Sequence, residues 1–271
     1  MINIIDRDTI LCISLAAKPS HHGVRFHNWL YDRLGLNYVY KAVAPHDIHA
    51  AVAGIRGLGI RGAGVSMPYK QDVIALLDEL DPSARRIHAV NTIVNTDGVL
   101  KGYNTDYLAV RELAQEKKLD PQASIAVLGS GGMAYAVVAA LSDYGFTGGT
   151  VVARNERTGS ELAQRYQWNY SREVPPQTQI LVNVTPLGMY GDYEDVQAFS
   201  DTAISSAEVV FDVVAYPVDT PLIQAAQAQS KIVITGGEVV ALQAARQFTL
   251  YTGVELTSED IAAAEHYAQQ V

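Results

Sequence analysis

The chain has 271 residues, of which 48% are hydrophobic and 18% are charged, as in an ordinary globular protein with room for two modest domains. The formal net charge of -9 at pH 7 argues against a general nucleic-acid surface, although a local cationic pocket for phosphate is compatible with it. The one cysteine, Cys12, excludes an internal disulfide, and no stretch approaches the roughly 18 apolar residues of a membrane helix, so a cytoplasmic protein is expected.

The first part of the chain alternates predicted strands and helices. Hydrophobic periodicity predicts strands over residues 9–13, 38–42 and 60–66, and helices over residues 24–34 and 46–58. Such alternation predicts a parallel sheet with covering helices. The loop after the first strand, LAAKPSHHG, holds Lys18, Ser20, His21 and His22, and loops in this position often carry binding groups. For the two histidines, ordinary loop polarity is the favoured interpretation over catalysis.

Residues 64–70, GVSMPYK, place a hydroxyl and a lysine on either side of a proline. Pro68 suits the first turn of a helix, which predicts that Lys70 lies near a helix N-terminus. A cation there opposes the helix dipole, so the placement invites a functional explanation, although an exposed surface lysine is the commoner case.

A hairpin is predicted farther along, where the runs AVNTIVN (89–95) and VLKGYNTD (99–106) flank the turn dipeptide Asp97-Gly98. The second run ends in three polar residues, Asn104, Thr105 and Asp106, just before a helix predicted to begin near residue 107. Capping that helix explains one of the three residues, which leaves the others available for function.

A glycine-rich stretch follows at SIAVLGSGGMAYAVVAAL (124–141), where a buried parallel strand meets a glycine cluster and opens into a helix. Gly129 permits a tight turn, Gly131 lets the backbone approach a pyrophosphate, and the helix N-terminus offers unpaired N–H groups. Alone such a loop is a weak signal, because plain strand–helix connections also contain glycine. In this context it predicts a dinucleotide-binding loop consisting of Gly129, Ser130, Gly131, Gly132, Met133 and Ala134.

The remaining segments predict a doubly wound open sheet. Strands over residues 150–153, 180–184, 209–213 and 231–234, with a helix over residues 158–166, continue the alternation, and further helices are predicted over residues 239–252 and from Thr257 onward. After the strand at 150–153, where an NAD site usually has Asp or Glu, the chain has Arg154 and Asn155. A guanidinium at this position favours a 2′-phosphate, which predicts NADP over NAD.

Together these motifs resemble the shikimate dehydrogenase family. Its fingerprints are N-V-T-x-P-x-K, A-V-N-T, G-Y-N-T-D and a glycine-rich nucleotide loop, and residues 64–70, 89–92, 102–106 and 129–134 occupy them in the right order. Later matches begin at residues 183, 212, 236 and 243, so the resemblance covers nearly the whole chain. GYNTD together with the lysine motif is a specific combination and indicates a divergent shikimate dehydrogenase-like paralogue.

The resemblance implies an α/β protein with an N-terminal α/β substrate domain (1–105), a doubly wound Rossmann domain for NADP (106–238) and C-terminal helices (239–271) that pack on the substrate domain. It implies an NADP-dependent alcohol dehydrogenase of aromatic amino acid biosynthesis that interconverts shikimate and 3-dehydroshikimate without a metal. A dehydrogenase of quinate or another cyclic hydroxy acid is the alternative, and a non-catalytic nucleotide-binding regulatory protein is the second alternative. The expected partner is a small cyclic hydroxy acid, and both a monomer and a homodimer are compatible with the sequence.

By the same resemblance, Lys70 and Asp106 form a central pair that moves the alcohol proton while a nicotinamide accepts the hydride. The sequence leaves open which of the two accepts the proton, because desolvation and pairing shift the pKa of a lysine in opposite directions. The implied substrate residues are Ser66, Asn91, Thr105, Tyr216 and Gln243, and the implied cofactor residues beyond the glycine loop, Arg154 and Asn155 are Thr185, Val213 and Gly236.

The chain departs from the family pattern where the substrate carboxylate is held. The two serines of the usual N-terminal loop are not both present, so Ser20 is the candidate for one, and Lys18 or a histidine is the candidate for the other donor. In the junction motif, Gly64 replaces the asparagine and Ser66 replaces the threonine. Each missing donor removes roughly 0.5–1.5 kcal/mol of binding free energy. A high KM or a low kcat for shikimate is therefore expected.

Overall fold

The structure is a computed structural model that describes residues 5–270, and the chain divides into two compact units. Unit 1 comprises the described residues up to Thr105 together with those from Ala241 onward, whereas unit 2 comprises Asp106–Val240. The chain therefore leaves unit 1 after Thr105 and returns to it at Ala241. Within residues 5–270, no helix is long and apolar enough to cross a bilayer.

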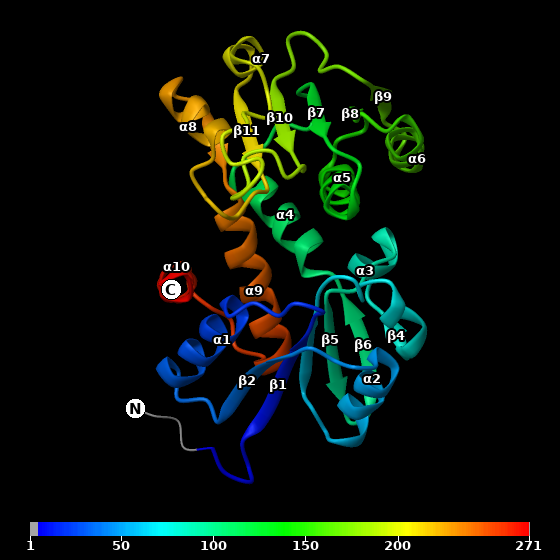
Figure 1. Cartoon of the computed structure of the whole chain (residues 1–271), viewed down its shortest axis with the longest axis vertical. Coiled ribbons are helices and arrows are strands. Elements are labelled where there is room, and N and C mark those ends of the chain that lie inside the picture. The colour runs from blue at the N-terminus through cyan, green and yellow to red at the C-terminus, as the bar shows by residue number, and fades with distance from the viewer. Residues whose placement is uncertain (1–4, 271) are drawn as a thin grey trace. The chain divides into compact units, whose positions relative to one another are not determined.

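A mixed six-stranded sheet forms the centre of unit 1. Its strands are β1 (Ile10–Leu15), β2 (Tyr38–Val43), β3 (Gly62–Val65), β4 (Glu79–Leu80), β5 (Thr92–Thr96) and β6 (Val99–Tyr103). They lie in the order β2-β1-β3-β5-β6-β4 (Figure 1). The pairs of β1 with β2 and with β3 are parallel, as predicted, whereas β5 pairs antiparallel with both β3 and β6.

The hairpin predicted around Asp97-Gly98 is confirmed, because these residues join β5 to β6 with φ values of 51° and 88°. The helix predicted to begin at Pro68 is wrong. Residues 67–71, which include the cis peptide bond between Met67 and Pro68, form turns, and only a short 3-10 helix, η1 (Asp72–Leu76), follows. The Tyr69 N–H donates to the Ser66 carbonyl and the Lys70 carbonyl accepts from Val90, so backbone groups that a helix would use are bonded elsewhere.

Helices cover both faces of the unit 1 sheet (Figure 1). They are α1 (His22–Arg33), α2 (Ile48–Gly57), α3 (Pro82–Ile87), the part of α9 (Gly236–Thr252) from residue 241 onward, and α10 (Ser258–Gln269). Because side chains alternate along β1, Cys12 joins a core with α1, α9 and α10, whereas Ile13 joins a core with α2. The predicted return of the C-terminal helices to the first domain is thereby confirmed.

Unit 2 is built on a parallel six-stranded sheet. Its strands are β7 (Ile125–Leu128), β8 (Thr150–Val152), β9 (Asn169–Ser171), β10 (Ile180–Asn183), β11 (Val209–Asp212) and β12 (Ile232–Ile234). The order β12-β11-β10-β7-β8-β9 is that of the predicted doubly wound sheet. Both β10 and β11 are buried along their whole length, as expected for a parallel sheet covered on two faces.

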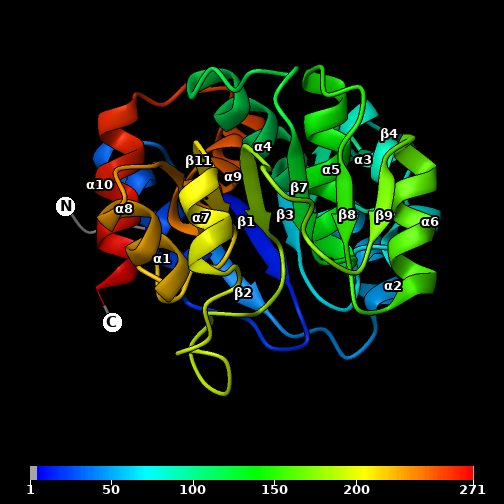
Figure 2. The same cartoon turned by 90° about the horizontal axis from the view of Figure 1, so that it is seen from above.

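Five helices accompany this sheet in the described chain: α4 (Thr105–Glu116), α5 (Gly132–Tyr144), α6 (Glu156–Tyr166), α7 (Asp201–Ser206) and α8 (Pro221–Ala228). Figure 2 shows β7, β8 and β9 side by side, with α6 next to β9. The strand order reverses between β7 and β10, so the loops after these two strands run in opposite directions. Doubly wound sheets bind their ligands at such a switch point, beyond the carboxyl ends of the strands.

Candidate functional site

A cluster of polar side chains lies in unit 1, where the start of β5, the start of α4 and the middle of α9 meet. We call it the Asn91 cluster. Its members are Asn91, Thr92, Thr105, Gln243 and Gln247. All of them except Gln243, which is half-buried, are at most 7% exposed. Buried polar groups are stable only where they are hydrogen-bonded, so the bonds of this cluster determine its geometry.

The side chain of Asn91 has a fixed orientation. Its Oδ1 atom accepts from the Thr105 N–H at 2.8 Å, the Thr92 hydroxyl at 2.9 Å and the Thr105 hydroxyl at 3.2 Å. Because a backbone N–H can only donate, the atom that it meets is the amide oxygen, and Nδ2 takes the other position. In the described chain Nδ2 is buried without a hydrogen-bond partner. A buried, unpaired donor costs free energy that an acceptor on a ligand would recover.

Three of the predicted substrate residues belong to this cluster. The Thr105 hydroxyl lies 3.4 Å from Gln243 Oε1, and it also bonds to Asn91. The amides of Asn91 and Gln243 thus both contact the Thr105 hydroxyl. Together they contain a donor and an acceptor, which is the combination that a hydroxyl of a ligand needs, because a hydroxyl both donates and accepts.

The departure from the family motif at Gly64 has a steric explanation. A Cβ atom at this position would lie 2.9 Å from the Tyr40 hydroxyl and 3.5 Å from Gln247 Nε2. Tyr40 and Gln247 therefore fill the space that a side chain at residue 64 would need. The asparagine of the family motif does not fit here unless the Tyr40 side chain moves.

Two backbone segments lie beside each other at the carboxyl ends of β1 and β3. The Ser66 N–H donates to the Leu15 carbonyl at 2.9 Å, and the Ala17 N–H donates to the Met67 carbonyl at 3.2 Å. These bonds fix the loop after β1 against the turn after β3. The two sequence motifs to which the resemblance assigns the substrate are thus neighbours in unit 1.

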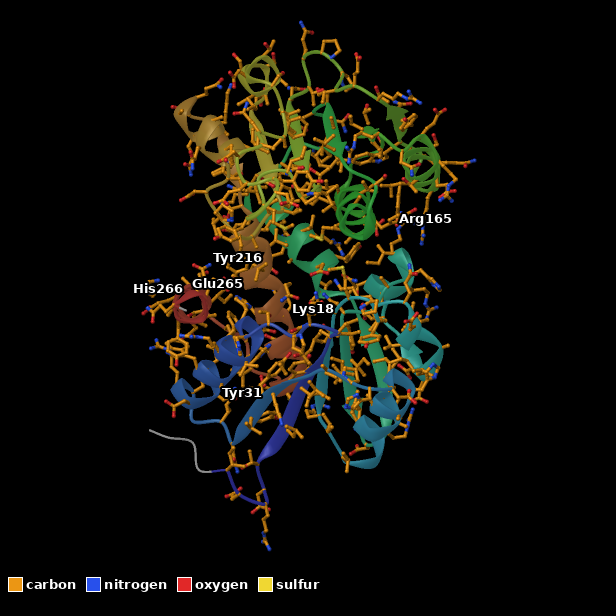
Figure 3. All side chains as sticks on the ribbon, viewed as in Figure 1. Lys18, Tyr31, Arg165, Tyr216, Glu265 and His266 are labelled. Atoms are coloured by element: carbon orange, nitrogen blue, oxygen red, sulfur yellow. The ribbon has the colours of Figure 1, made fainter. Side chains whose placement is uncertain are left out.

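The side chains on these two segments differ in exposure. Lys18, Ser20 and Ser66 are exposed, whereas Lys70 is half-buried. Figure 3 shows Lys18 just beyond the end of β1, and its ammonium has no partner in the part of the chain that the structure describes. A cation without a partner on this loop is available to a carboxylate.

Two further predicted residues belong to unit 2. Asp106 is half-buried in the first turn of α4, where a negative charge is favourable to the helix dipole, and it directly follows Thr105 of the Asn91 cluster. Tyr216 is 47% exposed in the loop after β11, and its carbonyl accepts from the Tyr190 N–H at 2.9 Å. Figure 3 labels Tyr216 on this loop.

A pocket of about 750 Å³ lies at the carboxyl ends of β7, β8 and β10 in unit 2, at the switch point of the sheet. Six of the predicted cofactor residues line it: Gly129, Ser130, Gly131, Arg154, Asn155 and Thr185. The pocket therefore brings together the glycine loop after β7, the basic turn after β8 and the loop after β10.

The glycine loop suits a pyrophosphate. Gly129 has a φ of 125°, and a Cβ atom there would lie 2.8 Å from the Val184 side chain, so only glycine fits. Cβ atoms at Gly131 or Gly132 would meet nothing within 4 Å, which leaves the loop open. Gly131 precedes α5 and provides no side-chain cap, so N–H groups of the first turn are available to an anion.

The turn after β8 offers a cation to the same pocket. Arg154 is exposed, and its guanidinium has no partner among residues 5–270. A guanidinium in this position can bind a phosphate through paired hydrogen bonds. Asn155 serves α6 instead, since its Oδ1 atom accepts from the Thr158 N–H at 3.3 Å. The Thr158 hydroxyl also lies 2.7 Å from the hydroxyl of Ser130, which links the two loops.

The other predicted cofactor residues lie outside the lining of this pocket. Gly132 and Met133 occupy the first turn of α5, whereas Ala134 is fully buried and packs within the unit. Val213 is half-buried after β11. Gly236 begins α9 and has no room for a side chain, because a Cβ atom would lie 2.2 Å from the Val214 carbonyl oxygen.

Comparison with known proteins agrees with the motifs. Residues 17–93 match the family model of the shikimate dehydrogenase substrate binding domain. A shikimate dehydrogenase-like protein of Haemophilus influenzae is 49% identical over 268 residues, which are 98% of this chain and 99% of that protein. The chain belongs to the shikimate dehydrogenase family.

Solved structures of the shikimate dehydrogenase family and of a quinate dehydrogenase resemble this chain. A shikimate 5-dehydrogenase of Thermus thermophilus, in complex with NADP(H) and shikimate, is 26% identical, with a TM-score of 0.85 and coverage of 96% of this chain and 99% of that one. A quinate dehydrogenase of Corynebacterium glutamicum, in complex with NAD, is 25% identical, with a TM-score of 0.88 and coverage of 97% and 99%.

The structure also shows a buried hydrogen-bond network around Asp212, to which the sequence analysis assigned no role. Asp212 is fully buried, accepts from Asn183 at 3.0 Å and from Thr220 at 2.7 Å, and its pKa is raised by burial. The Asn183 Oδ1 atom accepts from the N–H and the hydroxyl of Thr185 at 3.0 and 2.6 Å, which fixes the loop that lines the pocket. The available signal was a polar residue at the end of each apolar strand, ILVN and VVFD.

Proposed function

We propose that this chain is an NADP-dependent oxidoreductase that interconverts shikimate and 3-dehydroshikimate. The observation that carries the proposal is the buried Nδ2 group of Asn91, a fixed donor without a protein partner beside Thr105 and Gln243. A polyhydroxylated ring provides the acceptor that this donor needs and can donate to Gln243 Oε1 at the same time. Membership of the shikimate dehydrogenase family supports this substrate class.

The pocket of unit 2 fits NADP⁺. The open backbone around Gly131 and the uncapped N–H groups of α5 suit the pyrophosphate, and Arg154 suits the 2′-phosphate. When bound, NADP⁺ supplies the hydride acceptor. The NADP(H) in the Thermus thermophilus relative supports this choice.

Lys70 and Asp106 are the residues that we propose for the proton of the reacting hydroxyl. Oxidation of shikimate removes a hydride from carbon and a proton from oxygen, and the products are 3-dehydroshikimate, NADPH and a proton. An amine or a carboxylate within hydrogen-bond reach of the hydroxyl accepts that proton. The half-buried position of Lys70 and the place of Asp106 directly after Thr105 support these roles.

Weakened binding of shikimate is part of the proposal. The loop after β1 presents the exposed Ser20 and Lys18 where the family pattern has two serines, and Gly64 presents no side chain. Each lost donor removes roughly 0.5–1.5 kcal/mol of binding free energy. We expect a substrate that differs from shikimate at its carboxylate end to bind this loop more tightly.

The likeness to a quinate dehydrogenase favours quinate as a second candidate substrate. Initial rates of oxidation of shikimate and quinate, each measured with NADP⁺ and with NAD⁺, separate the candidates. The highest kcat/KM is expected for shikimate with NADP⁺. A higher kcat/KM for quinate would make quinate the preferred substrate, and equal or better turnover with NAD⁺ would contradict the proposed preference for NADP⁺. Absence of turnover with both acids and both cofactors would favour the non-catalytic alternative.

A further inference from the structure

Gln247 is the member of the Asn91 cluster that lies farthest from Asn91 in the sequence, and it is buried. We propose that Gln247 is a positioning residue, which acts through Thr92 to fix the orientation in which Asn91 presents its Nδ2 group to the substrate. The inference rests on the proposed function, because it assigns Asn91 to the substrate site. It adds a residue to which the sequence motifs gave no role.

The hydrogen bonds of Gln247 run in one direction. Its Nε2 group donates to the backbone carbonyl of Asn91 at 3.2 Å and to the Thr92 hydroxyl at 3.0 Å, so both of its N–H groups are used. A carbonyl can only accept, which identifies the donating atom as the amide nitrogen. The Thr92 hydroxyl in turn donates to Asn91 Oδ1 at 2.9 Å.

This direction supports the orientation of the Asn91 amide that the Thr105 N–H already sets. Thr92 Oγ1 accepts from Gln247 and donates its single proton to Asn91 Oδ1, so the bond from Gln247 helps to hold the hydroxyl in this orientation. Without Gln247, that hydroxyl is free to turn toward Thr105 Oγ1, which lies 3.4 Å away. Asn91 Oδ1 then loses one of its three donors, and the rotation of its amide is held less tightly.

The side chain of Gln247 is itself held in place. It is 7% exposed, and its Nε2 atom lies 3.5 Å from the position that a Cβ atom of Gly64 would take. The amide therefore packs at contact distance against β3. The backbone carbonyl that Gln247 contacts also accepts from the Val65 N–H at 2.7 Å, so the peptide of Asn91 is fixed by both β3 and α9.

A double-mutant cycle tests whether Gln247 acts through Asn91. Gln247→Met keeps the length of the side chain but removes both donors, and we expect kcat/KM for shikimate to fall about tenfold while KM for NADP⁺ is unchanged. Gln227→Met, the same change at an exposed position of α8, is the matched control and is expected to have no effect. In an Asn91→Ala background, Gln247→Met should add less than about a twofold further loss.

Two kinetic results would overturn the inference. One is a tenfold further loss of kcat/KM when Gln247→Met is added to Asn91→Ala, because Gln247 would then act independently of Asn91. The other is a kcat/KM of Gln247→Met within about twofold of the unmodified chain. If the unmodified chain itself does not oxidise shikimate, the proposed function fails. The positioning role of Gln247 is then tested by a measurement that needs no substrate.

That measurement is the side-chain amide signal of Asn91 in the ¹⁵N–¹H spectrum of the labelled full chain. The signal is assigned by its loss in Asn91→Ala. We expect it to shift or double in Gln247→Met and to stay in place in Gln227→Met. An unmoved Asn91 signal in Gln247→Met would refute the positioning role, whatever the activity of the protein.

Discussion

At the scale of single residues, Arg154 determines the expected choice between the two cofactors. Arg154→Ala should raise KM for NADP⁺ by about 10- to 100-fold, because hydrogen bonds to a charged group contribute about 1.5–3 kcal/mol. KM for NAD⁺ should stay unchanged, since NAD⁺ has no 2′-phosphate. Arg157→Ala is the control, because that guanidinium pairs with Glu161 at 3.4 Å. Steady-state kinetics with both cofactors checks this, and an equal loss for NADP⁺ and NAD⁺ would contradict it.

His27 makes the stability of unit 1 depend on pH. Its imidazole is fully buried and stacks on Tyr40 with 4.4 Å between ring centroids, and burial lowers its pKa to about 3. An unfolded chain has a histidine pKa of about 6.5, so the unfolded state binds an extra proton between these two values. The contribution of His27 to the free energy of unfolding is therefore fully present above about pH 6.5. It is lost as the pH falls below this value, by up to about 1.4 kcal/mol per pH unit.

The variant His27→Phe tests this pH dependence, because it keeps a ring in the stack and removes the titrating group. Urea unfolding at a series of pH values between about 6.5 and 4.5 should give a free energy of unfolding that falls less steeply for His27→Phe than for the unmodified chain. Parallel curves for the two proteins would show that His27 is not the source of the slope.

At the scale of elements, Gly62 allows α9 to pack closely on β3. A Cβ atom at this position would lie 2.2 Å from the ring of Tyr251, which is fully buried. Gly62→Ala should therefore lower the free energy of unfolding by about 1–3 kcal/mol. Gly54→Ala in α2 is the matched control, because nothing lies within 4 Å of its Cβ position, and it should stabilise by about 0.5–1 kcal/mol. Urea unfolding measures both, and a Gly62→Ala variant of unchanged stability would refute the packing argument.

Periodicity in the sequence predicted most of the strands and the longer helices. The strand predicted over residues 125–128 is β7. The strand predicted over residues 209–213 is β11, which ends one residue earlier, at Asp212. The elements β4, β9, α3, α7 and α8 were not predicted, because in two to eight residues a hydrophobic period is weak, and short strands were recognised only where the run is apolar, as in β8 and β12. The error at Pro68 has a different cause, since the turn after β3 is fixed by bonds to distant backbone groups.

At the scale of the whole molecule, local and distant contacts differ in what the sequence could predict. The glycine loop and Arg154 were predictable, because each follows its own strand within a few residues. The bond between Asn91 and Gln247 spans 156 residues, so no local pattern marks Gln247. His22 is a similar case. Loop polarity was the favoured interpretation, but His22 begins α1 and its Nε2 atom lies 2.8 Å from Glu265, which Figure 3 labels on α10.

Formation of NADPH from shikimate and NADP⁺ by the purified chain tests the central claim most directly. The rate should saturate with both substrates, and kcat/KM should lie below about 10⁶ M⁻¹s⁻¹, because donors to the carboxylate are missing. Lys70→Ala should lower kcat by about 10²-fold or more, since the proton of the hydroxyl then lacks its partner. A Lys70→Ala variant with a changed KM alone would make Lys70 a binding residue, and a kcat/KM at or above about 10⁶ M⁻¹s⁻¹ would refute weakened catalysis. An unmodified chain that forms no more NADPH than Lys70→Ala would contradict the proposed activity itself.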